Sequence, residues 1–154
     1  MQRTSLGQMA CPVARTLDVV GEWWTLLIVR DAFVGARRFE EFKATGIADN
    51  ILSARLKKLV EVGVLERRPY QAHPLRHEYL LTEKGKELGI VLAAMAGWGQ
   101  RWTEGENRRH LVHRGCGHDV SLNVRCDECE RTLTADEITV ERFPATTAAA
   151  TLSA

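Results

Sequence analysis

The segment Ala48–Gly63 reads ADNILSARLKKLVEVG, and its apolar residues recur every three or four positions. This spacing is typical of an amphipathic helix that buries one face in a core. Gly63 follows the last apolar residue, and glycine is common at the C-terminal end of helices. The predicted buried stripe consists of Ile51 or Leu52, Leu56, Leu59 and Val60. The solvent-facing side near the helix start then carries Asp49, Asn50, Ser53, Ala54 and Lys57.

Three segments with helical patterns precede this helix. Cys11 and Pro12 open the first one, because proline is tolerated in the first turn of a helix. Trp23–Val34 forms the second, which is apolar nearly all round and is therefore predicted at the centre of the core. Arg37–Ala44 is a short third segment with its two phenylalanines on one side, and a glycine separates it from the Ala48–Val62 helix.

The period changes to that of strands directly after this helix. Val64–Arg68 and His77–Leu81 are predicted to pair as a β-hairpin, with Gln71–Arg76 as its polar, basic loop. Thr82 can cap the long helix that follows, although Gly85 stands where a capping box would place Glu or Gln. The whole order predicts a mainly α fold with a small β-hairpin wing, which is a winged helix-turn-helix.

Positive charge is concentrated in the same part of the chain. The segment Ser53–His77 has six basic and two acidic residues, whereas the whole chain has a net charge of +1. The major groove of DNA admits an α-helix, and clustered positive charge suits a polyanion, so we predict binding to double-stranded DNA. An ordinary solvated face is the alternative interpretation of the charges. The predicted DNA-contacting residues are Arg37, Arg38, Asp49, Asn50, Ser53, Ala54, Lys57, Lys58, His73 and Arg76.

These side chains divide by chemistry. Asn50 and Ser53 can hydrogen-bond to base edges, and Ala54 is small enough to contact a thymine methyl group. The two lysines suit phosphates or guanine, and the two arginines before the short helix suit the phosphate backbone. The basic residues of the wing suit a neighbouring groove or its phosphates.

The helix after Thr82 has a long apolar stripe that ends in two tryptophans. Its members are Leu88, Val91, Leu92, Met95, Trp98 and Trp102. One helix laid on a small domain needs less apolar surface than this, and aromatic residues and methionine are enriched at protein interfaces. We therefore predict a homodimer formed through this stripe and the first helix, with packing inside one chain as the alternative.

Seven blocks of sequence follow one another in a set order. They are Cys11–Val13, Gly21–Ile28, Arg30–Asp31, Arg37–Phe39, Asn50–Leu59, Gly63–Arg67 and Tyr79–Gly85. In this order they resemble the HxlR family of bacterial regulators, which are relatives of MarR, over residues 8–102. The resemblance implies a winged-helix homodimer that binds an operator with two-fold symmetry and regulates transcription. Ala48 departs from the family pattern of a small polar residue at this position, which leaves the helix cap to Asp49.

Cys11 stands just before a predicted helix, where the helix dipole favours a thiolate and therefore a reactive sulfur. The resemblance adds that some members of the family use the cysteine of this motif to sense oxidants or electrophiles. Redox sensing by Cys11, or control by a small ligand, is therefore expected. A packed and inert thiol is the alternative.

The other three cysteines lie in a separate, Cys-rich segment. His113-x-x-Cys116 and Cys126-x-x-Cys129 are two ligand pairs with the spacing of a zinc ribbon, and His118 is a rival for the fourth ligand. A segment this poor in apolar side chains would gain stability from one structural Zn²⁺ per chain. Idle or buried thiols are the alternative interpretation.

The composition suggests three parts. Residues 8–104 are the predicted DNA-binding and dimerisation domain, residues 106–143 the zinc-ribbon-like β extension, and residues 144–154 a low-complexity tail that is predicted to be disordered. Met1–Met9 is polar and Trp23–Val29 is too short to span a bilayer, so we expect a cytoplasmic protein, with its DNA in the bacterial nucleoid, and no membrane partner.

An enzyme is the competing class, for instance a metal-dependent hydrolase that uses the Cys/His cluster. The sequence shows no nucleotide-binding loop, no nucleophile motif and no general base at a suggestive spacing from the candidate ligands. We therefore predict that the protein is not an enzyme. A zinc ribbon that docks a protein partner is a further alternative, which is compatible with DNA binding.

Overall fold

The structure is a computed structural model of the chain, and it describes residues 5–106 and 111–141. The chain divides into two compact units, Met1–His110 and Leu111–Ala154. The predicted tail, residues 144–154, lies outside the described residues. No helix within the described ranges is both long enough and apolar enough to cross a membrane.

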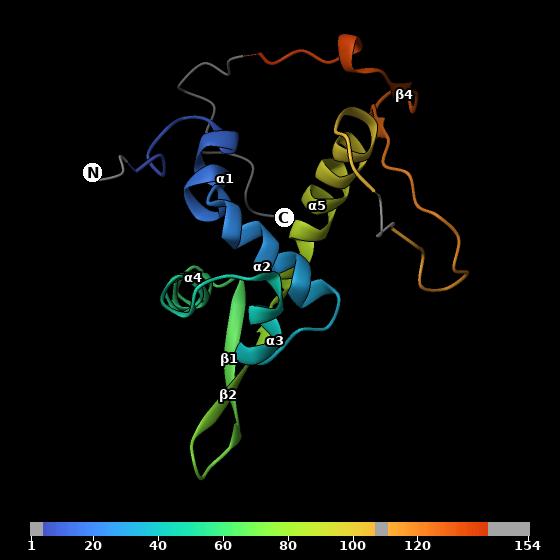
Figure 1. The fold of residues 1–154 in the computed structure, drawn as a ribbon. Helices are drawn as coiled ribbons and strands as arrows, with labels where there is room; N and C mark the ends of the chain where they lie inside the picture. The colour runs from blue at the N-terminus through green and yellow to red at the C-terminus, as the bar shows by residue number, and fades with distance from the viewer. Residues whose placement is uncertain (1–4, 107–110, 142–154) are drawn as a thin grey trace. The chain divides into compact units, whose positions relative to one another are not determined.

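The first unit has the predicted order of helices and strands. Short helices lead to the segment Asp49–Glu61, and a hairpin and one long helix follow it (Figure 1). The elements are α1 (Pro12–Val20), α2 (Trp23–Phe33), α3 (Phe39–Phe42), a 3-10 turn (Lys43–Thr45), α4 (Asp49–Glu61), β1 (Leu65–Gln71), β2 (Arg76–Leu81) and α5 (Glu83–Trp102). The winged helix-turn-helix part of the predicted fold is confirmed.

The core of this unit lies where α2, α3, α4 and β1 meet. Its buried side chains are Ile28, Val29, Phe42, Ile47, Leu52, Leu56, Leu59, Val64 and Leu65. Three members of the predicted α4 stripe, Leu52, Leu56 and Leu59, are at most 1% exposed, and the fourth, Val60, is partly buried and packs against the same core. Gly46, with φ of 82°, makes the sharp turn between the 3-10 turn and α4, a conformation that a glycine adopts without steric cost. The stripe therefore fixes α4 with its polar face outward.

The expectation of a fully surrounded α2 is wrong at its first residue. Ile28 and Val29 are buried, but Trp23 is 83% exposed although it belongs to the same helix. The part of α2 that begins with Trp23 is therefore not covered by the described residues of this chain. The period of apolar residues shows which faces of a helix are apolar, but it does not show which of these faces are covered.

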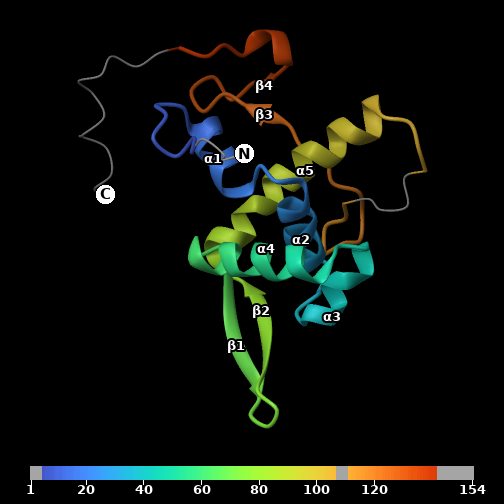
Figure 2. The ribbon, with the colours of Figure 1, turned by 60° about the vertical axis from the view of Figure 1, so that its left-hand side comes forward.

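The wing is an antiparallel hairpin that is longer than predicted. Its register runs from Leu65 opposite Leu81 to Gln71 opposite Arg76, with an irregularity between Pro69 and Gln71. Gln71 and Arg76 were predicted in the loop but are paired strand residues, so the loop is 72–75. Figures 1 and 2 show that the hairpin projects away from the helices of this unit.

The base of the wing is held by the start of α5. The Thr82 hydroxyl accepts a hydrogen bond from the Gly85 N–H, as predicted for a helix cap, and donates one to the Gly63 carbonyl at 2.6 Å. A Cβ on Gly85 would lie 2.2 Å from the Val64 carbonyl oxygen. The capping box is therefore absent at this residue for a packing reason: any side chain there would push the helix off the first wing strand.

The second unit contains little regular structure. It has β3 (Val124–Arg125) paired with β4 (Thr132–Leu133), a 3-10 turn (Ala135–Glu137) and an isolated antiparallel bridge between Val112 and Asp119. The β part of the predicted extension is present, and its identity as a zinc ribbon stays a prediction.

Candidate nucleic-acid interface

The polar face of α4 is a continuous exposed ridge. Each residue predicted to face DNA from this helix is exposed, namely Asp49, Asn50, Ser53, Ala54, Lys57 and Lys58. A helix of 13 residues is about 20 Å long, which is enough to lie across a major groove. Lys57 has only a long contact of 3.9 Å to Glu61, so its ammonium group remains available to a phosphate.

The start of α4 differs from the expectation that Asp49 caps this helix. Ala48 is the N-cap residue, and its methyl group cannot accept a hydrogen bond, while Asp49 is the first residue inside the helix. The Asp49 carboxylate lies 3.0 Å from the Lys43 ammonium group instead of capping the helix. The hydrogen bond to Asp49 raises the pKa of Lys43. This pair fixes the helix start against the preceding turn.

Arg37 and Arg38 lie beside the wing. The backbone N–H groups of both donate to Glu41, which lowers the pKa of that carboxyl. Arg38 forms a bridge with Glu78 of β2, and its guanidinium lies 4.5 Å from the centre of the Tyr70 ring. The two arginines are exposed, and the isolated bridge from Arg38 to Glu78 holds this segment next to the hairpin.

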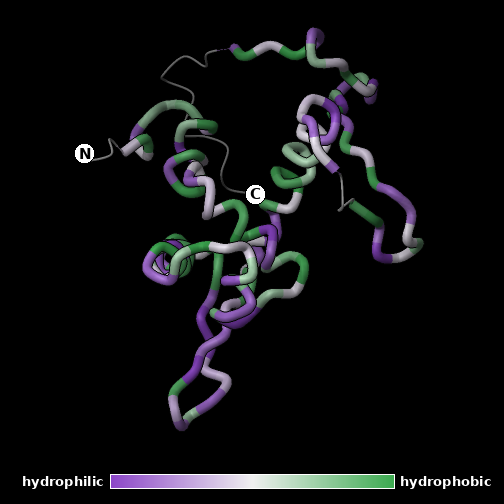
Figure 3. The backbone as a smooth tube through the Cα atoms, viewed as in Figure 1, coloured by the Kyte–Doolittle hydropathy of each residue, from purple (hydrophilic) through white to green (hydrophobic). Residues whose placement is uncertain are grey.

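The wing itself presents polar and basic side chains. His73 and Arg76 are exposed at its tip, and the hairpin is largely hydrophilic along its length (Figure 3). Arg67 lies 2.9 Å from Nδ1 of His77, on the neighbouring strand. A cationic hairpin that projects beyond the protein body is suited to phosphates or to a groove beside the one that α4 would occupy.

The structure adds two residues that the sequence did not single out. Lys43 lies one turn before α4 next to Asp49, and Tyr70 supports Arg38 from the wing. In the sequence, Lys43 is a single basic residue in the turn before α4, and a single basic residue does not stand out from other surface charges. Arg55, although basic and within α4, is only partly exposed and pairs with Glu22 at 3.4 Å, so it belongs to the packing of the domain.

An apolar surface remains uncovered on α1, α2 and α5. The predicted stripe of α5 separates into two parts, because Leu88 and Leu92 pack against the core while Met95, Trp98 and Trp102 are 52, 63 and 68% exposed. Other large exposed apolar side chains on these helices are Val13, Leu17, Trp23, Ile90 and Val91. Packing within this chain therefore explains why Leu88 and Leu92 are apolar, but it does not explain the exposed residues Met95, Trp98 and Trp102.

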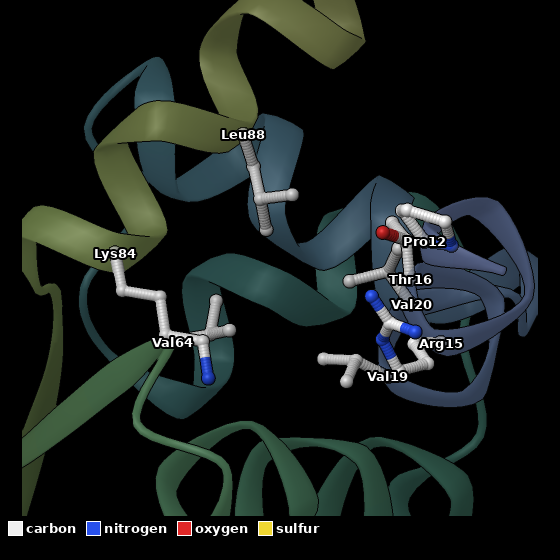
Figure 4. Close-up of a pocket in the computed structure, with 8 residues that line it drawn as sticks. All are labelled: Pro12, Arg15, Thr16, Val19, Val20, Val64, Lys84 and Leu88. Atoms are coloured by element: carbon white, nitrogen blue, oxygen red, sulfur yellow. The ribbon is translucent and has the colours of Figure 1, made fainter. Parts of the chain in front are cut away.

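Cys11 is the N-cap residue of α1 and is partly buried. A pocket of about 300 Å³ begins at the next residue, Pro12, and is lined also by Val64 and Leu88. Figure 4 shows Arg15 and Lys84 among its lining side chains, on opposite sides of the pocket. Because Val64 directly precedes β1 and Lys84 lies in the first turn of α5, the pocket adjoins α1, α5 and the base of the wing.

The predicted metal ligands of the second unit form two separate pairs. Nδ1 of His113 lies 3.1 Å from Sγ of Cys116, and Cys126 is hydrogen-bonded to Cys129. Backbone N–H groups of Cys129 and Glu128 lower the pKa of the Cys126 thiol. Within residues 5–106 and 111–141, no three His, Cys, Asp or Glu side chains form a group that could hold a metal ion.

Comparison with known proteins identifies the family. The model of the HxlR-like helix-turn-helix matches residues 19–107 of this chain. The relative Rv3095 of Mycobacterium tuberculosis, named an uncharacterized HTH-type transcriptional regulator, is 42% identical over 136 residues, which are 86% of this chain and 85% of that protein. The relatives are transcriptional regulators, which confirms that the chain is not an enzyme.

Solved structures give the same result. PA1607, a candidate transcription factor, is 44% identical with a TM-score of 0.81, and the match covers 91% of this chain and all of that one. The redox regulator HypR, in its oxidized form, is 34% identical with a TM-score of 0.54, over 62% of this chain and all of that one. This chain is a transcriptional regulator that belongs to the HxlR-like helix-turn-helix family.

Proposed function

We propose that two copies of this chain bind an operator of two-fold symmetry, with one α4 in each of two successive major grooves and the wings on the flanking phosphates. The observation that carries the proposal is the exposed ridge of α4, fixed by three fully buried leucines on its other side. Two copies place their recognition helices about 34–36 Å apart when half-sites lie one turn apart. The dimer would act on the bacterial chromosome, in the cytoplasm.

Base readout falls to the first turns of α4. Asn50 can bond in bidentate fashion to adenine, and Ser53 and Ala54 lie on the same face one turn further on. The negative charge of Asp49 would oppose DNA, but Lys43 at 3.0 Å compensates it. Arg38, held by Tyr70, and Arg76 at the wing tip add contacts to phosphate that carry no base information.

Replacement of both Lys57 and Lys58 by alanine is expected to weaken DNA binding by roughly 10- to 100-fold near physiological salt, and to reduce the slope of log affinity against log salt by about 2. Both side chains are exposed, so the fold should be unchanged. The measurement is a fluorescence anisotropy titration at several salt concentrations, on an operator selected from genomic fragments with the wild-type protein.

Lys86→Ala is the matched control, because Lys86 is equally a helix lysine but pairs with Glu83 at the start of α5. It should leave affinity and salt slope unchanged. Unchanged binding by the double lysine variant would show that another face reads DNA. Failure of the wild-type protein to enrich any DNA fragment would reject the proposed function itself.

Cys11 supplies the proposed control of binding. HypR is named a redox regulator, and YodB of Bacillus subtilis has been solved in a reduced and in a diamide-treated form. In this chain Cys11 is the N-cap residue of α1 and is partly buried. The adjacent pocket, with Arg15 and Lys84, is the place for a small-ligand effector with an apolar body and a negative charge.

Cys11→Ser is expected to abolish the release of operator DNA by diamide, because the hydroxyl of serine is not oxidised under these conditions. Gel shifts with and without diamide, followed by a reductant, measure this release. The control is Lys86→Ala, which keeps all four cysteines and should respond as the wild type does. A Cys11→Ser protein that diamide still releases excludes Cys11 as the sensor, and release by a small organic anion in the same variant would assign control to the pocket.

A further inference from the structure

The second unit contains the same hairpin twice. In the first copy, the N–H of His113 donates to the carbonyl of His118 at 2.9 Å, and the N–H of Gly117 donates to the carbonyl of His113 at 2.7 Å. In the second copy, the N–H of Cys126 donates to the carbonyl of Arg131, and the N–H of Glu130 to the carbonyl of Cys126, both at 3.0 Å. Each hydrogen bond joins the same relative positions in both copies.

The backbone angles of the two copies agree as well. Gly117 has φ of 73° and Glu130 has φ of 59°, and each residue directly follows the second member of its ligand pair. A glycine adopts this conformation freely, but a glutamate does so at a steric cost. The second turn thus keeps the shape of the first although its sequence does not favour that shape.

Each turn directs two ligand atoms to one side. His113 and Cys116 occupy the first and fourth positions of one turn, and Cys126 and Cys129 occupy the same positions of the other. The separation of 3.1 Å between Nδ1 of His113 and Sγ of Cys116 is close to the roughly 3.5 Å that two ligands of a tetrahedral zinc ion require. In the second turn, backbone N–H groups of Glu128 and Cys129 hydrogen-bond to Sγ of Cys126, so the turn holds this sulfur in place.

This unit has little else to stabilise it. Within 111–141, its described part, every residue is exposed except Cys126 and Leu133, which are partly exposed. Val112, Val124 and Ile138 are 45, 51 and 46% exposed, so its apolar side chains build no core. A segment of this size without a core needs a cross-link or a metal ion to keep one structure.

We propose that the two turns close on one structural Zn²⁺ ion, held by His113, Cys116, Cys126 and Cys129. The two pairs form no common cluster in the structure, so binding would draw the two hairpins together. His113 is assigned as the fourth ligand because it occupies the position of Cys126 in the repeated turn, whereas His118 occupies the position of Arg131. Four protein ligands leave no open position for catalysis, so the ion would stabilise the unit. The proposal does not depend on DNA binding.

The test is elemental analysis of the full-length protein, purified under reducing conditions with zinc supplied and then dialysed without chelator. The wild type should contain about one zinc per chain. His113→Ala and Cys129→Ser should contain far less than half of one, and His118→Ala should match the wild type. Substitution of Co²⁺ should give the intense visible bands of a tetrahedral thiolate site in the wild type and in His118→Ala only.

Two outcomes would contradict the proposed zinc site. A wild-type protein without zinc would overturn the proposal. Zinc lost in His118→Ala and kept in His113→Ala would overturn the assignment of the fourth ligand. Circular dichroism and operator binding are measured on every variant, because the ligand substitutions lie outside the first unit and should leave both signals of the winged helix unchanged.

Discussion

Phe42→Ala should lower the free energy of unfolding by about 3–5 kcal/mol, which is a large part of the 5–15 kcal/mol typical of a whole domain. Phe42 is 0% exposed at the end of α3, where it packs in the same core as the α4 leucines. Its ring also meets Tyr79 of β2 edge to face, with 6.5 Å between ring centres. One side chain therefore connects the scaffold helix, the recognition helix and the wing, and its loss leaves a cavity between them.

Urea unfolding, followed by circular dichroism at one fixed protein concentration, measures this loss. Fixed concentration matters because the proposed dimerisation would contribute to apparent stability. Leu75→Ala is the control: Leu75 is also a large apolar residue, but it is 64% exposed at the wing tip, and its loss should change the free energy by less than about 0.5 kcal/mol. An equal effect of the two substitutions would contradict the assigned core.

Local periodicity was sufficient to predict this core. Leu52, Leu56 and Leu59 are adjacent on a helix of any orientation, so their spacing alone identifies the buried face of α4. The polar face then follows from geometry, and all ten predicted DNA-contacting residues are exposed. Their contacts with bases or phosphates remain predictions.

The errors lie where one element of the fold contacts another. The engagement of Asp49 by Lys43 depends on the turn between α3 and α4, and the extension of β1 to Gln71 depends on pairing with Arg76. The sequence shows that Gly85 replaces the last residue of a capping box but not the reason, which is that contact with the Val64 carbonyl excludes any side chain. Propensity and spacing are local properties, and tertiary packing overrides them at such points.

The same limit applies to the apolar residues of α5. The sequence predicted one stripe, but the structure separates Leu88 and Leu92, which pack on the core, from Met95, Trp98 and Trp102, which are exposed. Spacing cannot distinguish a face that its own chain covers from one that another copy covers. The exposed part is therefore the sharper candidate for the dimer interface, and it is the part to mutate.

Replacement of both Met95 and Trp98 by aspartate should convert the proposed dimer to a monomer, with an increase of at least about 1000-fold in the dimer dissociation constant. The two side chains are 52 and 63% exposed, so the change should not unfold the monomer. In an apolar interface, however, each new carboxylate would lose its hydration without forming a hydrogen bond or ion pair in exchange, which disfavours association. Operator affinity should fall strongly as well, because a monomer holds one half-site only.

Ile90→Asp is the matched control for this pair. Ile90 is 64% exposed on the same helix, but a rotation of about 100° per residue places it roughly 140° from Met95 and 80° from Trp98, outside the stripe that these two residues form. Sedimentation analysis over a range of concentrations should find a monomer for the double variant and a dimer for Ile90→Asp. If the double variant stays dimeric and binds the operator normally, the two copies meet elsewhere, and the tryptophans of α5 serve another contact. If the double variant becomes monomeric, the exposed half of the α5 stripe forms the dimer interface. Because α5 begins at the Thr82 cap against the base of the wing, this interface would then set the distance between the two recognition helices.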